Sequence, residues 1–225
     1  MKEGKLIVIE GACDGIGKST QYKLIKERLE KDGYNVSSHH FPSYDTPEAS
    51  PVEEYLKGEF GKPEDISPYF INGLYAIDRG ATWLKKLKPL YDKGNIILLD
   101  RYTPSSLIYQ SALIEDTKTR KDFINYVIDF EYNKIGIKEP DCVIFLDADF
   151  DVVNKLRKMR KDNEGIVDDI HEKDEVFMKK VHENAQFVAD YLNFSKIKCD
   201  DKDAMRKIED IHEDIFKVIK KTLEK

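Results

Sequence analysis

The chain has few cysteines and no long apolar run. Its 225 residues include only three cysteines, Cys13, Cys142 and Cys199, which lie far apart in the sequence. An odd, widely spaced set of this kind matches neither a disulfide framework nor a zinc site, so we expect reduced thiols in a cytoplasmic protein. No stretch approaches the roughly 18 apolar residues of a membrane-spanning helix, and the first residues show no signal-peptide pattern.

The chain also lacks an excess of positive charge. It has 37 basic and 43 acidic residues, which gives a net charge of −6. Nucleic-acid-binding proteins usually carry a broad basic surface, so we expect no nucleic-acid partner, although a local basic pocket for small phosphates is compatible with this balance. Internal repeats and low-complexity linkers are missing as well, and the length fits a single domain, residues 1–225.

Short apolar runs alternate with amphipathic stretches. We predict buried strands at residues 6–9, 36–41, 96–99, 143–146 and 195–199. Helices are predicted at residues 21–31, 67–88, 121–134, 152–161, 172–192 and 204–223, with Pro89 ending the second of them. Strands that alternate with helices form parallel β-α-β units. The sequence therefore predicts an α/β fold, a doubly wound parallel five-stranded sheet with helices on both faces.

Two polar, irregular segments interrupt this alternation, at residues 42–51 and 160–169. In doubly wound sheets, ligands bind beyond the carboxyl ends of the strands, where long polar loops of this kind lie. We expect the second segment to belong to a short lid at about residues 157–170.

The most informative segment is residues 5–20, KLIVIEGACDGIGKST, in which an apolar strand leads through a glycine-containing turn into a helix. This order is typical of a phosphate-binding P-loop, in which main-chain N–H groups and the helix N-terminus bind phosphate oxygens. Lys18 would reach the β- and γ-phosphates, and the Ser19 hydroxyl would bind Mg²⁺. We predict that a nucleoside triphosphate is bound by Asp14, Gly15, Ile16, Gly17, Lys18, Ser19 and Thr20.

This loop departs from the usual spacing at one position. The first glycine of the motif would fall at residue 12, which is Ala12, while Gly11 lies one residue too early. A Cβ atom makes positive φ costly, so Ala12 requires an ordinary backbone conformation. The alternative is a glycine-rich turn between a strand and a helix that binds no phosphate.

A second polar group follows the apolar run at residues 96–99. Asp100 would hold Mg²⁺ beside the phosphate loop, and Arg101 would bind a second phosphate group; the alternative is a surface ion pair between the two. His39 and His40 end another predicted strand, but neighbours in a strand face opposite sides, so we expect no shared metal site.

Together these motifs resemble the thymidylate kinase family of P-loop nucleoside-monophosphate kinases. The order and spacing hold from about residue 5 to residue 192. The resemblance implies Mg²⁺-dependent transfer of a phosphoryl group from ATP to dTMP, giving dTDP for dTTP synthesis, and suggests a homodimer. The segments that match are Glu10 to Thr20, Leu74-Tyr75-Ala76-Ile77-Asp78-Arg79, Asp100-Arg101-Tyr102, Ser105 with Tyr109-Gln110, and Pro140-Asp141 before Leu146-Asp147-Ala148-Asp149.

The resemblance also implies an acceptor site. Tyr75 would stack on thymine, and Arg79, one helical turn later, would donate to thymine O4, which cytosine replaces with an amino group. Ser105, Tyr109 and Gln110 would line the same pocket from one helix. From the residues alone, core packing of the tyrosines and a surface salt bridge of Arg79 with Asp78 or another neighbour stay open as alternatives.

The catalytic residues implied by the resemblance are Lys18, Arg101, Asp14 and a lid arginine. Asp14 would face the 3′-hydroxyl or the phosphate end of the acceptor. Family members with glycine at the Gly15 position usually take the arginine from the lid, where this chain offers Arg157 and Arg160. We prefer Arg160 because it lies at the loop end of its predicted helix, and a solvated helix face is the alternative for both.

One departure from the family concerns the acceptor phosphate. Family members often carry a Phe-Pro-x-Arg segment, but this chain has Tyr44 in place of the arginine. Tyr44 would donate a hydrogen bond to the phosphate without adding charge. Two other functions stay open: a deoxynucleoside kinase, in which Glu10 would act as the base for a 5′-hydroxyl, and a non-catalytic nucleotide-binding regulator with the same fold.

Overall fold

The computed structural model describes residues 3–11, 15–164, 175–202 and 204–224, with the backbone alone described at 158–164. Strands and helices alternate through most of this length. The elements are β1 (Lys5–Gly11), α1 (Lys18–Lys31), β2 (Val36–His40), α2 (Ser50–Lys57), η1 (Pro63–Asp65), α3 (Pro68–Thr82), η2 (Trp83–Leu87), α4 (Lys88–Tyr91), β3 (Ile96–Asp100), α5 (Thr103–Tyr109), η3 (Ser111–Leu113), α6 (Thr117–Ile128), η4 (Asp129–Ile135), β4 (Cys142–Asp147), α7 (Phe150–Glu164), α8 (Glu175–Tyr191), β5 (Ser195–Lys198), β6 (Asp200–Asp201), β7 (Ala204–Met205) and α9 (Ile208–Leu223).

The described strands form a five-stranded parallel sheet in the order β2-β3-β1-β4-β5, and a separate two-stranded ribbon, β6-β7. Strand β3 is buried throughout, and β1 is buried at every position after Lys5. Such continuous apolar runs are typical of parallel strands with both faces covered. The predicted α/β sheet is confirmed.

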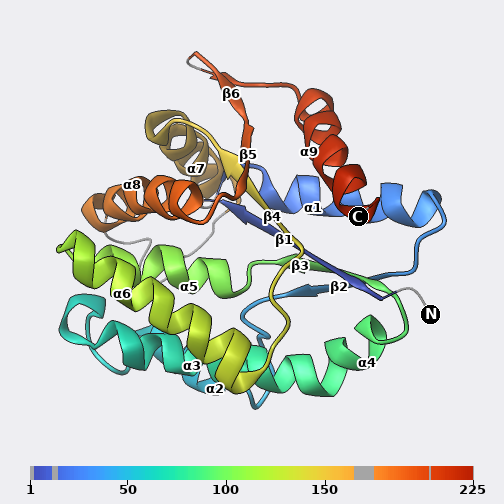
Figure 1. Cartoon of the computed structure of the whole chain (residues 1–225). Coiled ribbons are helices and arrows are strands. Elements are labelled where there is room, and N and C mark those ends of the chain that lie inside the picture. The colour runs from blue at the N-terminus through green and yellow to red at the C-terminus, as the bar shows by residue number, and fades with distance from the viewer. Residues whose placement is uncertain (1–2, 12–14, 165–174, 203, 225) are drawn as a thin grey trace.

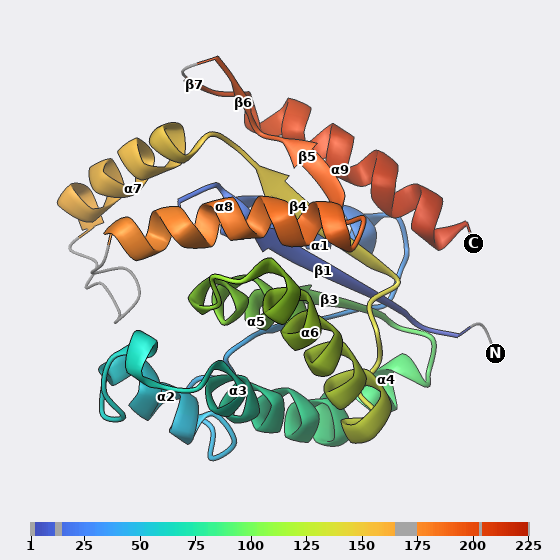
Figure 2. The same ribbon diagram turned by 60° about the vertical axis from the view of Figure 1, so that its left-hand side comes forward.

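Helices cover both faces of the sheet. Helices α1 and α9 lie on one face, and α3, α4 and α6 lie on the other, as Figure 1 shows. Alternate residues of one strand serve the two faces, since Leu6 and Val8 pack with the α3–α4 side while Ile7 and Ile9 pack with α1 and α9. Figure 2 shows α8 above α5, consistent with their close packing.

This topology creates a crevice at the carboxyl ends of β1 and β3. The two strands are neighbours, with Ile9 paired with Asp100, but the helix after β1 crosses one face and the helices after β3 cross the other. Strand β2 also ends here, since His40 pairs with Asp100. Ligands of doubly wound folds bind at such a switch point, and the P-loop and the Asp100-Arg101 pair both begin there.

Three boundaries differ from the prediction. Pro89 does not end the helix, because π-helical η2 leads into α4, where Pro89 occupies the first turn and its missing N–H costs no bond. The segment predicted as irregular at 42–51 leads into α2, which also carries a proline, Pro51, in its first turn. The final helix begins at Ile208 because residues 200–205 form the β6-β7 ribbon.

Within the described part of the chain, no helix combines the length and apolar character needed to span a bilayer. The predicted lid at residues 157–170 begins on α7 and continues into residues 165–174, which lie outside the described residues.

Candidate active site

The phosphate loop joins β1 to α1 through two glycines with positive φ. Gly15 has φ of 95° and Gly17 has φ of 88°, a conformation that residues with a Cβ atom rarely adopt. Gly17 is also the N-cap of α1, so no side chain caps this helix, and its first turn contains no acidic residue. The N–H groups and the positive end of the helix dipole therefore remain available to an anion. Ala12 and Asp14 lie outside the described residues.

The other loop residues divide between core and solvent. The Ile16 side chain is 2% exposed and anchors the loop in the core, so only its main chain can serve a ligand. Ser19 and Thr20 are exposed at the start of α1, and Ser19 lines the cavity described below. Lys18 is buried, with its ammonium group directed toward the end of β3.

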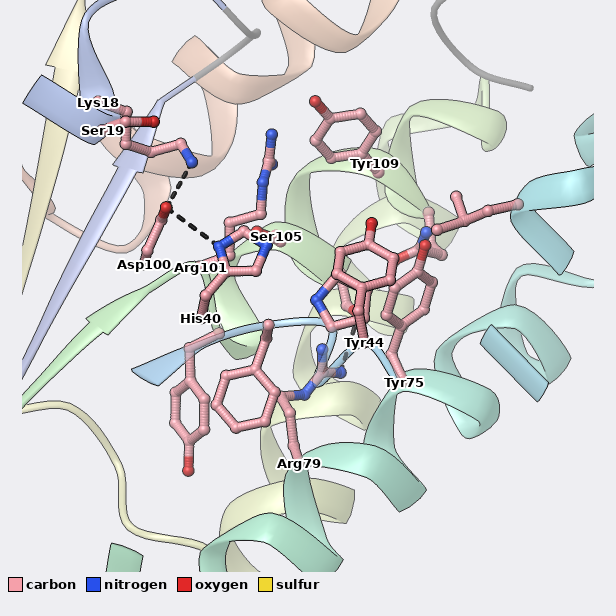
Figure 3. A pocket seen from close by; sticks show the side chains of 16 residues that line it. Lys18, Ser19, His40, Tyr44, Tyr75, Arg79, Asp100, Arg101, Ser105 and Tyr109 are labelled. Carbon is pink, nitrogen blue, oxygen red and sulfur yellow. Dashed lines mark hydrogen bonds and ion pairs between the residues drawn. The ribbon is translucent and has the colours of Figure 1, made fainter. Parts of the chain in front are cut away.

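Asp100 links three elements at the crevice. One of its oxygens accepts a hydrogen bond from Lys18 Nζ, and the other lies 3.1 Å from His40 Nδ1 (Figure 3). Burial would raise the pKa of Asp100, but the bond from His40 and the charge of Lys18 outweigh it and hold the pKa well below its usual range. Asp100 is therefore a carboxylate at neutral pH, as a ligand of Mg²⁺ must be.

Arg101 leaves the strand in an unusual backbone conformation. Its φ is 65°, its N–H bonds to the Ile9 carbonyl at 3.1 Å, and its guanidinium lies 5.5 Å from the centre of the Tyr109 ring. Positive φ at a residue with a Cβ atom is costly and concentrates at functional sites. Arg101 Nη1 lies 3.7 Å from Glu10 Oε1, and the Arg101 side chain is 14% exposed, so Arg101 is not the surface residue of the alternative interpretation.

These groups open into one cavity of about 270 Å³. It extends from the start of α1 to Leu56 of α2 and Tyr75 of α3, and its wall is both polar and apolar (Figure 3). The residues that line it are Lys18, Ser19, His40, Phe41, Pro42, Tyr44, Leu56, Tyr75, Arg79, Asp100, Arg101, Tyr102, Ser105, Ser106, Tyr109 and Gln110. All seven side chains predicted to bind an acceptor are among them.

Arg79 lies in the wall of this cavity and is 1% exposed. Its Nε and Nη2 atoms lie 2.7 and 2.6 Å from the two carboxylate oxygens of Glu131, and Nη2 also lies 2.9 Å from Ser106 Oγ. The alternative of a surface salt bridge with Asp78 is wrong, because Asp78 instead accepts the Ser43 N–H at 2.8 Å.

The two predicted tyrosines border the same space. Tyr75 is partly buried, packs edge-on against Tyr55 and lies 5.8 Å from the Arg79 guanidinium, measured to its ring centre. Tyr44 is 47% exposed and stacks on His40, with ring centres 6.0 Å apart and planes 19° apart. Tyr44 thus lies beside the Asp100 end of the cavity, where a phosphate would be expected.

Helix α5 contributes polar groups to the opposite wall. The Ser105 hydroxyl donates to Glu10, while Ser106, one residue later, contacts Arg79. Gln110, the C-cap of α5, is 2% exposed, and its Oε1 has no hydrogen-bond partner among the described residues. A buried amide oxygen without a partner is costly, and here it borders the cavity.

One lid arginine can be placed. A Cβ atom added to Gly15 would lie 3.4 Å from the main-chain nitrogen of Arg157, so α7 passes directly over the phosphate loop at this residue. The Arg160 side chain lies outside the described residues. The main chain of Arg157 thus lies at the phosphate loop, while the preference for Arg160 stays a prediction.

Sequence reasoning missed three residues of this region: His40, Ser106 and Glu131. No role was predicted for His40 beyond the exclusion of a metal site shared with His39. Its partner Asp100 lies 60 positions away in the sequence, so no local pattern shows this contact. A signal for Glu131 was present, since it follows the buried residues Phe123 and Val127 at intervals of four, in phase with the apolar face of the predicted helix.

Comparison with known proteins gives a consistent set of similarities. The sequence profile of the thymidylate kinase family matches residues 9–215. The chain is 32% identical over 222 residues to thymidylate kinase from Plasmodium falciparum (isolate 3D7), covering 98% of this chain and 91% of that one. It is 33% identical over 227 residues to thymidylate kinase from Thermoanaerobacter sp. (strain X514), covering 98% and 100% of the two chains. Identity to a probable thymidylate kinase from Thermococcus kodakarensis is 34% over 224 residues, covering 96% and 98%.

A solved structure shares the fold. The chain is similar to the structure of thymidylate kinase from Candida albicans with a TM-score of 0.71 and 22% identity, covering 97% of this chain and 92% of that one. At this identity, the likeness concerns the arrangement of sheet and helices.

Proposed function

The chain belongs to the thymidylate kinase family, and we propose that its cavity is the site at which the γ-phosphoryl group of ATP is transferred to dTMP. ATP-dependent phosphorylation of dTMP is the activity that family membership and the named relatives support. In this reaction, the bond between the γ-phosphorus and the β–γ bridging oxygen breaks. An oxygen of the dTMP phosphate forms the new bond, and the products are ADP and dTDP.

One observation carries the assignment of the site: a single cavity joins a phosphate loop to a buried arginine. Lys18, Ser19 and Asp100 lie at one end, and Arg79 with Tyr75 lies at the other. A nucleotide held between these ends would place its phosphate near the donor and its base among the aromatic rings. Proximity of this kind, with positive charge on the transferring group, is the main contribution of kinases to catalysis.

The donor end fits Mg·ATP. The uncapped N-terminus of α1 supplies N–H groups to the phosphates, and Lys18 would leave Asp100 to bridge the β- and γ-phosphates. The Ser19 hydroxyl and the ionised Asp100 carboxylate are oxygen donors of the type that Mg²⁺ prefers, and they would hold the ion. When bound, Mg²⁺ would neutralise charge on the phosphates during transfer.

The base end offers one donor and one acceptor. Arg79 can donate to a carbonyl oxygen, and the unpartnered Gln110 Oε1 can accept from an N–H group. Thymine presents O4 as an acceptor and N3–H as a donor, whereas cytosine presents the reverse pair. The polar pattern of the pocket therefore supports thymine over cytosine, with Tyr75 stacking on the ring.

The phosphate of dTMP would lie between the two ends, against Arg101. Tyr44, stacked on His40 beside Asp100, is placed to donate a hydrogen bond to it. Arg157, which passes over Gly15, is the lid arginine that we assign to the transferring group. Asp14 and Arg160 keep the roles that the family resemblance implies.

The alternative of a deoxynucleoside kinase is not favoured. Its base would be Glu10, but this side chain is completely buried and is not part of the cavity wall. Its two oxygens accept hydrogen bonds from the Ser105 hydroxyl and the Gly11 N–H. Burial raises the pKa of Glu10 despite the nearby charges of Arg101 and Lys18.

We also propose that the protein acts as a homodimer, in the cytoplasm. Phe70, Ile77 and Leu84 follow one another at intervals of seven along α3 and η2 and are 49%, 59% and 59% exposed. Helix α3 lies on the side of the molecule away from α9 (Figure 1), and a second copy of the chain would cover the apolar stripe. Cys142 and Cys199 are buried free thiols, which suits a reducing compartment.

The test is coupled ADP formation with Mg·ATP against dTMP, dUMP, dCMP, dGMP and thymidine. We expect turnover with dTMP well above that with dCMP. The Candida albicans structure is described as revealing the origin of broad substrate specificity, so the series includes a purine. Turnover with thymidine alone would support the alternative of a deoxynucleoside kinase. Slow ATP hydrolysis that does not depend on any acceptor would support the alternative of a nucleotide-binding regulator.

A further inference from the structure

Glu131 lies behind the base end of the cavity and holds Arg79 with both of its oxygens. It comes from η4, is completely buried and does not line the cavity itself. The two contacts, at 2.7 Å to Nε and 2.6 Å to Nη2, form a bidentate pair that fixes the plane of the guanidinium. Arg79 therefore has little freedom to turn toward any other partner.

The remaining contacts of Arg79 leave one nitrogen for a ligand. Nη2 also meets Ser106 Oγ at 2.9 Å and Asn72 Oδ1 at 3.3 Å. Within the described part of the chain, the hydrogen bonds of Arg79 use Nε and Nη2, and none uses Nη1. Because Arg79 lines the cavity, Nη1 is the donor that a bound molecule would meet.

The charge of Arg79 is neutralised inside the protein. Glu131 meets Arg79 at hydrogen-bond distance in a site closed to solvent. A carbonyl oxygen needs a hydrogen-bond donor and no net positive charge. Arg79 is thus suited to a neutral carbonyl oxygen.

The ionisation of the pair agrees with this geometry. Burial would lower the pKa of Arg79, but the charge and the hydrogen bonds of Glu131 outweigh that effect and raise it. Arg79 therefore remains a cation when it is held by Glu131.

We propose that Glu131 is a positioning residue for base selectivity. It orients Arg79 so that Nη1 donates to the carbonyl oxygen of the acceptor base. The inference rests on the proposed function, since it assumes a nucleoside monophosphate in this cavity. It adds a residue outside the cavity wall that acts on the base through Arg79.

The test compares Glu131→Gln with a matched control. The substitution keeps the size of the side chain and removes its charge and one acceptor oxygen. We expect the ratio of kcat/KM for dTMP to that for dCMP to fall about tenfold or more, mainly through KM for dTMP, with KM for ATP within about twofold of wild type. Asp129→Asn makes the same chemical change at an exposed position of η4, where the side-chain partners among the described residues are Asn133 and Lys134, and it should leave the ratio unchanged.

A double-mutant cycle separates positioning from a general structural role. If Glu131 acts through Arg79, adding Glu131→Gln to Arg79→Met should not change the dTMP to dCMP ratio further. An unchanged dTMP to dCMP ratio in Glu131→Gln would overturn the proposal, whether both activities stay at the wild-type level or fall equally.

Two provisions keep the result interpretable. If Glu131→Gln does not fold, Glu131→Asp will test the proposal. Aspartate keeps the charge, but its side chain is one methylene too short to bind both nitrogens of Arg79. A wild-type dTMP to dCMP ratio in that variant would refute the proposal, and a reduced ratio would support it. Wild-type protein without dTMP turnover would refute the proposed function, whereas normal wild-type turnover with an unchanged ratio in the variant would refute only the role of Glu131.

Discussion

Replacing Arg79 by methionine tests base recognition directly, since methionine keeps much of the side-chain length and removes every donor. The lost contact to thymine O4 would be a hydrogen bond from a charged group in a buried site. Such bonds contribute about 1.5–3 kcal/mol, which corresponds to a loss of roughly 10- to 150-fold in kcat/KM for dTMP. Turnover of dCMP should change little, because its 4-amino group cannot accept this bond.

The same substitution also removes the partner of a buried carboxylate. Glu131 is completely buried and pairs with Arg79 through two hydrogen bonds. Breaking a buried ion pair from one side costs about 3–5 kcal/mol, a large part of the 5–15 kcal/mol that typically stabilises a domain. Arg79→Met alone should therefore unfold at a clearly lower temperature, and Arg79→Met combined with Glu131→Gln should recover part of that loss.

The assay is ADP formation at saturating Mg·ATP with dTMP and dCMP varied, alongside thermal unfolding of each variant. We expect the selectivity to fall in both variants that carry Arg79→Met, while KM for ATP stays near wild type because Arg79 lies away from the phosphate loop. Unchanged selectivity in a folded variant would show that Arg79 does not contact the base. A loss of ATP affinity equal to the loss of dTMP affinity would refute the assignment of the two ends of the cavity.

Three further predictions concern other parts of the molecule. Gly15→Ala should reduce turnover strongly while the protein stays folded, because φ of 95° is strained for alanine and the new Cβ would lie 3.4 Å from the Arg157 nitrogen; steady-state kinetics with a circular dichroism control will test this. Ile77→Glu should shift the protein from dimer to monomer in sedimentation experiments, because the residue is 59% exposed on the apolar stripe; an unchanged mass would refute the proposed interface. Burial raises the pKa of the Cys199 thiol from its ordinary value of 9.0 to about 12, so this thiol should react with iodoacetamide at pH 8 only after unfolding. Because the unfolded thiol loses its proton first, this group lowers the free energy of unfolding as the pH rises above about 9.

Much of the fold was predictable because its signals are local. Continuous apolar runs predicted the buried strands, and their alternation with helices predicted the parallel sheet. Two of the three boundary errors involve proline. Pro51 is predicted to lie in an irregular segment and Pro89 to end a helix, but both occupy first turns, of α2 and of α4, a position that the sequence pattern alone does not reveal.

The site residues that belong to local sequence motifs were predictable. Those outside the motifs were not. Lys18, Ser19 and Asp100 were identified from their place after buried strands, and the structure brings all three to one cavity. Ser106 was not predicted because the family motif points to its neighbour, Ser105. Only the packing of α5 against α3 decides which of the two hydroxyl groups contacts Arg79.

The sequence by itself determined the class of fold, the family and the chemistry of the phosphate loop, because strand periodicity, glycine conformation and helix dipoles act over a few neighbouring residues. Only the tertiary structure decided the partners of the decisive polar groups. His40 meets Asp100 across 60 positions, and Glu131 meets Arg79 across 52. Such pairs form only when helices and strands distant in sequence pack together and exclude water, so no local pattern shows which carboxylate a buried arginine will face.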